Sequence, residues 1–233
     1  MKKEIIISGF GGQGVLAIGK NLVEAGLEEG LEVTWAPSYG PEMRGGTANC
    51  HVVLSDRKIG SPLVVRPTEL IAMNGPSLEK FAHLVQQGGL ILINSSVVRE
   101  KAEQPGVRTL YIPCGEIAEE LGNPKVANMV MLGAYIGATG ALHPDTVRSM
   151  IHHMFTGAKA KLVSLNLQAL ERGIACAGEA QAGILQEKFQ KSAPAERSAP
   201  PGLPHFPGKR DQNRKKTVDF AAAPAYKKHR VMR

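Results

Sequence analysis

The first fifteen residues constrain the fold more than any other stretch of this chain. An apolar run, Ile5–Ser8, leads into the glycine-rich segment Gly9–Gly14, and Val15 then begins a helical pattern of apolar residues. A strand, a tight glycine turn and a helix in such close succession are typical of α/β proteins. Bare backbone amides at such a turn, together with the positive end of the helix dipole, favour an anion. The pattern predicts a phosphate or another anion near this turn.

The glycines of this turn also allow a second interpretation. Gly9, Gly11 and Gly14 have the G-x-G-x-x-G spacing of dinucleotide-binding proteins, although the same spacing occurs where a turn merely packs tightly. NAD-binding proteins usually place an Asp or Glu about 20 residues later, at the carboxyl end of the second strand. Here the expected second strand ends in the residues Trp-Ala-Pro at 35–37. An NAD(P)-binding oxidoreductase is therefore the weaker hypothesis.

Hydrophobic periodicity beyond the turn predicts alternating strands and helices, followed by helices alone. We expect strands at 5–8, 31–36, 47–54, 70–73, 90–94 and 109–113, and helices at 15–29, 76–87, 117–121, 126–139, 146–155 and 159–188. This order predicts an α/β fold: a mostly parallel, Rossmann-like sheet with helices on both faces and a helical C-terminal cap.

The composition changes sharply near residue 188. Residues 1–187 carry 16 Lys and Arg against 18 Asp and Glu, whereas residues 188–233 carry 12 against 3 and are rich in proline. We expect one domain at 1–187 and a disordered basic tail at 188–233, because the tail has few apolar residues to offset its ordering entropy. A dispensable tail fits this composition, and so does a tail that attracts an acidic partner or nucleic acid. We expect the first, with no nucleic-acid partner.

The cysteines and histidines predict no metal site. Cys50, Cys114 and Cys176 lie more than 60 residues apart without a C-x-x-C pair, as in buried thiols of a reducing compartment. An iron–sulfur cluster usually needs four thiolates, and the histidines are dispersed. No apolar run approaches the roughly 20 residues that span a bilayer. We expect a cytoplasmic protein that does not enter a membrane.

A second glycine-rich loop follows the expected second strand. The segment PSYGPEMRGGTANC at 37–50 combines backbone freedom with hydrogen-bonding side chains, notably those of Ser38, Tyr39 and Arg44. Its position at the carboxyl end of that strand places it beside the first turn, where open α/β sheets bind their ligands. The alternative is a purely structural loop in which Arg44 pairs with a carboxylate.

Six motifs in order resemble the gamma subunit of the 2-oxoacid:ferredoxin oxidoreductases. They are GFGGQGV at 9–15, PSYGPEMRGGTANC at 37–50, GSPLV at 60–64, AMNGPSLEKF at 72–81, GGLILINSS at 88–96 and NMVMLGAY at 128–135. The resemblance covers about residues 3–185. The second motif is more similar to the 2-oxoglutarate and 2-ketoisovalerate enzymes than to the pyruvate enzyme.

This resemblance implies a share in a multi-subunit reaction. The family decarboxylates a 2-oxoacid on thiamine diphosphate, passes two electrons through iron–sulfur clusters to ferredoxin, and releases an acyl-CoA. The expected partners are alpha, beta and delta subunits, the last of them ferredoxin-like, with ferredoxin itself contacted indirectly. Thiamine diphosphate, Mg and the iron–sulfur clusters are expected on those partners, so this chain should be inactive alone.

The resemblance further implies that this chain holds part of CoA, which is a substrate. No residue is assigned a catalytic role and no metal ligand is expected. A structural assembly subunit without a ligand is the main alternative, and an NAD(P)-binding oxidoreductase is the other. The expected CoA-binding residues are Gly9, Gly11, Gly12, Gln13, Gly14, Ser38, Tyr39, Arg44, Gly45 and Gly46.

Overall fold

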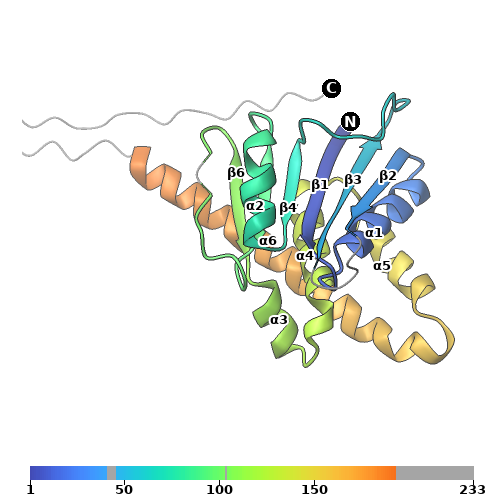
Figure 1. Ribbon diagram of the computed structural model, residues 1–233. Coiled ribbons are helices and arrows are strands. Elements are labelled where there is room, and N and C mark those ends of the chain that lie inside the picture. The colour runs from blue at the N-terminus through green and yellow to red at the C-terminus, as the bar shows by residue number, and fades with distance from the viewer. Residues whose placement is uncertain (41–45, 103, 193–233) are drawn as a thin grey trace, which may run out of the picture. The chain divides into compact units, whose positions relative to one another are not determined.

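The apolar runs of the sequence form one six-stranded sheet in the computed structural model, which describes residues 1–40, 46–102 and 104–192 (Figure 1). The strand order is β2-β3-β1-β4-β5-β6. β3 runs antiparallel to both of its neighbours, whereas β1, β4, β5 and β6 pair in parallel. The predicted α/β fold is confirmed. The strands are β1 (Lys2–Phe10), β2 (Glu32–Tyr39), β3 (Thr47–Ser55), β4 (Glu69–Ala72), β5 (Leu90–Asn94) and β6 (Arg108–Ile112).

The helices divide between the two faces of this sheet. Alternate strand residues point to opposite faces, so Ile5 and Ile7 pack with most of the helices while Ile6 packs with α2. Figure 1 shows α2 in front of the sheet and α1, α4 and α6 behind it. The helices are α1 (Val15–Glu28), α2 (Gly75–Phe81), α3 (Cys114–Glu120), α4 (Ala127–Thr139), α5 (Pro144–Met154) and α6 (Val163–Ser192), with 3₁₀ turns η1 (Ala82–Leu84), η2 (Pro124–Val126) and η3 (Gly157–Leu162).

Several bounds differ from the sequence-based expectations, notably those of β2 and α2; α6 also begins only at Val163, after a 3₁₀ turn, where a helix from 159 was expected. β2 continues through Pro37 to Tyr39, which an edge strand tolerates because it needs ladder hydrogen bonds on one side only. The helix expected at 76–87 ends early: the 3₁₀ turn Ala82–Leu84 follows α2, and then Val85 adopts an extended backbone and the Gln86 amide donates to the Pro67 carbonyl oxygen at 2.9 Å. The expected disordered tail lies outside the described residues, apart from the end of α6.

The chain leaves β1 and β2 at the same end of the sheet, where their carboxyl ends lie. Phe10, the last residue of β1, pairs with Thr47, and Tyr39, the last residue of β2, pairs with Ala48. β3 therefore lies between the glycine turn and the end of β2. β4 lies next to β1, on the side away from β3. After β1 the chain continues into α1 on one face of the sheet, and after β4 it continues into α2 on the opposite face. The carboxyl ends of β1 and β4 thus form the topological switch point of this sheet.

Candidate functional site

The glycine turn leads into α1, whose first amides have no hydrogen-bond partner among the described residues. Gly12 and Gly14 have φ values of 100° and 75°, in the left-handed region that glycine adopts without strain. Gly14 is the N-cap residue of α1 and offers no side chain to the helix, and the Ile18 amide donates to the Gly14 carbonyl oxygen at 3.0 Å. The amides of residues 15–17 consequently have no carbonyl partner within the helix. These amides can donate hydrogen bonds to an anion, which the positive end of the helix dipole also attracts.

A pocket of about 630 Å³ opens beside these amides. Its floor is mostly apolar, and its walls come from the turn, the first turn of α1, and the ends of β2 and β3. None of its described lining residues is charged, so among them the amides and the dipole provide the attraction for an anion. Such a pocket suits a ligand with a flat apolar body beside a phosphate. The lining residues are Phe10, Gly11, Gly12, Gly14, Val15, Leu16, Ala17, Trp35, Pro37, Tyr39, Thr47 and Ala48.

Most of the glycine residues predicted for the site gather around this pocket. Gly11, Gly12 and Gly14 line it, together with the side chain of Tyr39. Gly46 lies next to it, because its carbonyl oxygen accepts a hydrogen bond from the Gly11 amide at 2.8 Å. This bond joins the two glycine loops that the sequence places 35 residues apart.

Other predicted residues lie elsewhere. Ser38 stands between Pro37 and Tyr39, which both line the pocket, so strand alternation directs the Ser38 side chain to the opposite face of β2. Gly9 and Gln13 belong to the turn but are absent from the pocket lining, and the Gln13 side chain bonds within the chain. Arg44 lies outside the described residues, as does Gly45.

Two contributors to the site were not predicted. Asn128 of α4 packs directly against the turn, since a Cβ built on Gly14 would lie 2.7 Å from the Asn128 Nδ2 atom. Trp35, in the middle of β2, also lines the pocket. The motif at 128–135 was a signal for Asn128, but its contact with a residue more than 100 positions earlier depends on the packing of α4.

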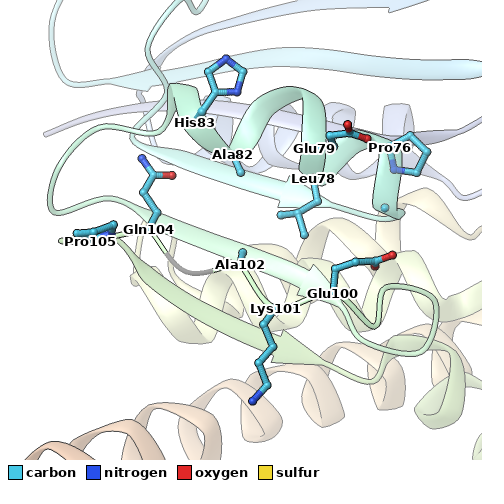
Figure 2. A pocket seen from close by; sticks show the side chains of 11 residues that line it. Pro76, Leu78, Glu79, Ala82, His83, Glu100, Lys101, Ala102, Gln104 and Pro105 are labelled. Carbon is cyan, nitrogen blue, oxygen red and sulfur yellow. The ribbon is translucent and has the colours of Figure 1, made fainter.

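A larger hollow, of about 730 Å³, lies between α2 with η1 and a segment that contributes the described residues 100–102 and 104–105 (Figure 2). Leu78 points toward this segment, and Ala82 faces Ala102 across the gap. Two carboxylates, those of Glu79 and Glu100, belong to its lining. Lys101 also belongs to the lining, but its side chain points away from α2 in Figure 2, so the two carboxylates still make this hollow a poorer candidate for a phosphate than the glycine-turn pocket.

The cysteine thiols take no part in this pocket. Cys50 is fully buried, its Sγ donates to the Val15 oxygen at 3.7 Å, and burial raises the pKa of the thiol to about 12. Cys114 is equally buried and Cys176 is partly exposed; burial raises the pKa of both thiols. High thiol pKa values mean little thiolate, and thiolate is the nucleophilic and metal-binding form. Cys50 and Cys114 are thus the buried, inert thiols that were predicted.

Metal clusters and membrane spans are both missing from the described part of the chain. No group of three or more His, Cys, Asp or Glu side chains lies together there as metal ligands would. Within the same residues, no helix has both the length and the apolar character needed to cross a bilayer.

Comparison with known proteins identifies the family. A family model described as pyruvate ferredoxin/flavodoxin oxidoreductase matches residues 4–176, which include the glycine turn, the sheet and α4. The chain belongs to this family.

Relatives within the pyruvate ferredoxin/flavodoxin oxidoreductase family differ in length. The chain is 43% identical over 169 residues to the ketoisovalerate oxidoreductase subunit VorA of Methanothermobacter marburgensis, covering 72% of this chain and 35% of VorA. It is 35% identical over 183 residues to the 2-oxoglutarate synthase subunit KorC of Methanocaldococcus jannaschii, covering 77% of this chain and 96% of KorC. The chain thus spans about a third of VorA and almost all of KorC.

Two solved structures share the fold. The gamma subunit of a keto/oxoacid ferredoxin oxidoreductase from Geobacter sulfurreducens superposes with a TM-score of 0.66 at 28% identity, covering 76% of this chain and 99% of that one. A 2-oxoglutarate:ferredoxin oxidoreductase from Magnetococcus marinus, solved with 2-oxoglutarate, coenzyme A and succinyl-CoA bound, has a TM-score of 0.70 at 24% identity, covering 76% of this chain and 31% of that one. The predicted resemblance to gamma subunits is confirmed.

Proposed function

We propose that this chain is the gamma subunit of a cytoplasmic 2-oxoacid:ferredoxin oxidoreductase acting on 2-oxoglutarate or a branched-chain 2-oxoacid, and that its glycine-turn pocket holds part of CoA. The amides of residues 15–17, which have no partner among the described residues, lie beside a mostly apolar pocket and carry this proposal. The names of VorA and KorC support the substrate class, and the CoA bound in the Magnetococcus enzyme supports the ligand.

CoA matches the two halves of this pocket. Its diphosphate is an anion that can accept hydrogen bonds from the amides at the start of α1, as phosphates commonly do at helix N-termini. Its adenine ring and pantetheine chain are less polar and can lie against Trp35, Tyr39 and Phe10, which line the same pocket. Binding of this kind orients CoA, and the chemistry at its thiol then belongs to groups on another chain.

Partner chains supply the redox chemistry in this proposal. Three dispersed cysteines, two of them buried, do not fit the four thiolates of an iron–sulfur cluster. The two-thirds of VorA that this chain does not match shows that a relative carries substantial further sequence on the same polypeptide. We expect alpha, beta and delta subunits to provide thiamine diphosphate, Mg, the clusters and the route to ferredoxin.

Amide hydrogen exchange tests this proposal on the enzyme assembled with its partners. CoA should slow exchange at residues 11–17 and leave the glycine turn at Gly88–Gly89, at the amino end of β5, unchanged. The purified chain alone should not turn over a 2-oxoacid. Normal assembly without protection at residues 11–17 would favour the structural-subunit alternative, and protection by NAD(P) in place of CoA would favour the dinucleotide alternative.

A further inference from the structure

The side chain of Gln13 crosses the crevice at the topological switch point. Its Oε1 atom accepts a hydrogen bond from the Phe10 amide at 2.7 Å, and its Nε2 atom donates to the Met73 carbonyl oxygen at 3.1 Å. Nδ2 of Asn74 also donates to Oε1, at 3.4 Å. These bonds tie the glycine turn after β1 to the first residues after β4. The crevice in which open α/β sheets usually bind ligands is therefore occupied by this chain itself.

Gly9 provides the space for this arrangement. A Cβ built on Gly9 would lie 2.7 Å from Oε1 of Gln13 and 2.9 Å from Cβ of Met73, closer than carbon atoms approach without displacement. Cγ2 of Val15 would lie equally close, at 2.8 Å, so a side chain at residue 9 would displace the Gln13 amide or the Val15 and Met73 side chains around it. The first glycine of the motif and Gln13 form one unit, which explains why neither belongs to the pocket lining.

We infer that Gln13 is a positioning residue that closes the β1–β4 crevice and holds the turn so that its amides face the pocket beside β2 and β3. This inference rests on the proposed function. It explains how the chain would favour a phosphate at α1 over a dinucleotide at the switch point. A dinucleotide that crosses the switch point, as in Rossmann-type dehydrogenases, meets the Gln13 amide. A phosphate that approaches from the β2–β3 side meets the amides at the start of α1, which the described part of the chain leaves without a partner.

The position of β3 between β1 and β2 also disfavours a dinucleotide at the switch point. Neighbouring strands lie about 4.8 Å apart, so the antiparallel β3 places the end of β2 roughly 9.6 Å from β1, twice the usual separation in a dinucleotide-binding sheet. An acid at the end of β2 would be too distant to hold a ribose bound at the switch point. Tyr39, the last residue of β2, lines the pocket instead, together with Trp35 in the middle of the strand.

Gln13→Met tests the inference, because methionine keeps the volume of glutamine and loses all three hydrogen bonds. Ser77→Ala is the matched control: Oγ of Ser77 accepts a buried 2.8 Å hydrogen bond from Ser8 of β1 and does not touch the turn. In the ligand-free protein, Gln13→Met should raise amide exchange at residues 10–14 at least tenfold. In the assembled enzyme it should raise the KM for CoA about tenfold with kcat unchanged. Ser77→Ala should change neither quantity.

Amide exchange at residues 10–14 tests the inference, and CoA binding tests the proposed function, so the two can fail separately. Unchanged exchange at residues 10–14 in Gln13→Met would overturn the inference, whatever CoA does. An equal effect of Ser77→Ala on the KM for CoA would also overturn it, because the change would then reflect general destabilisation. Faster exchange in the variant, together with no CoA protection in the wild-type enzyme, would support Gln13 as the tether and refute CoA as the ligand.

Discussion

Gly173 of α6 lies directly against the backbone of Val130 in α4. A Cβ built on Gly173 would overlap the Val130 carbonyl oxygen and lie 2.8 Å from the Ala134 nitrogen. The relationship is reciprocal, because a Cβ on Gly133 of α4 would overlap the carbonyl oxygen of Leu170 in α6. Small residues on both helices allow their backbones to touch. This contact packs α6 against α4, the helix whose Asn128 contacts the glycine turn.

Substitution of Gly173 tests this contact. Gly173→Ala should destabilise the protein by about 1–3 kcal/mol, because the two helix backbones must separate, despite the roughly 1 kcal/mol gain in helix propensity. Gly178→Ala in the same helix is the control: its Cβ would meet nothing within 4 Å, so the propensity gain should appear there as added stability. Urea denaturation of both variants checks the pair. Equal stabilisation by both would contradict the close helix contact.

His51 predicts a pH dependence of the loop at 59–66. Its Nδ1 atom accepts a hydrogen bond from the Val64 amide at 2.9 Å, and burial lowers the pKa of this half-buried imidazole. A pKa that is lower in the folded state means stability that is present above the unfolded pKa of about 6.5 and is lost as the pH falls toward the folded value. His51→Asn keeps an acceptor that does not titrate. Wild-type stability should therefore fall more steeply between pH 7 and pH 5 than that of the variant; parallel curves would refute the prediction.

Tyr135 carries a buried hydroxyl without a hydrogen-bond partner among the described residues. Burial raises its pKa well above the usual value, and the nearby Glu69 charge adds to this, so the hydroxyl stays protonated. Tyr135→Phe removes the unsatisfied group and should leave stability unchanged or raise it by about 1 kcal/mol. Thermal unfolding at pH 7 checks this. A loss of more than about 1 kcal/mol would mean that an internal water satisfies the hydroxyl.

The local elements of this fold were predictable because their signals are local. The continuous apolar run at Leu90–Asn94 is β5 with the same bounds, and α1 begins at Val15 directly after the glycine turn, as predicted. The position of β3 was not predictable from such signals. Its pairing with β1 and β2 is antiparallel, and alternation within 47–54 does not specify which strands it contacts or in which direction.

The candidate site was predictable in part for the same reason. The positive φ of Gly12 and Gly14 and the free amides of α1 follow from a strand–glycine–helix sequence. The contact of Asn128 with Gly14 and the bond from Gln13 to Met73 depend on side chains that meet only after the sheet has formed. The motif alone therefore suggests a ligand-binding role for Gln13, whereas its side-chain amide is engaged by Phe10, Met73 and Asn74.

A charge at Gly12 tests whether the turn receives an anion. Gly12 lines the pocket, has a φ of 100°, and would have open space around a Cβ. Gly12→Asp therefore adds backbone strain and a carboxylate beside the free amides. Gly30→Asp is the matched control, since Gly30 has a φ of 74° and equally open space but lies after α1, away from the pocket. Each substitution should cost about 1–2 kcal/mol of stability through strain.

The two variants should separate in their response to CoA. In the assembled enzyme, the carboxylate introduced by Gly12→Asp should compete with the CoA phosphates for the amides of α1. We therefore expect the KM for CoA to rise at least tenfold in this variant, about 1.4 kcal/mol of binding. Gly30→Asp should keep the wild-type KM, because its strain lies at the far end of the helix. Equal KM values in the two variants would show that no phosphate binds at the glycine turn.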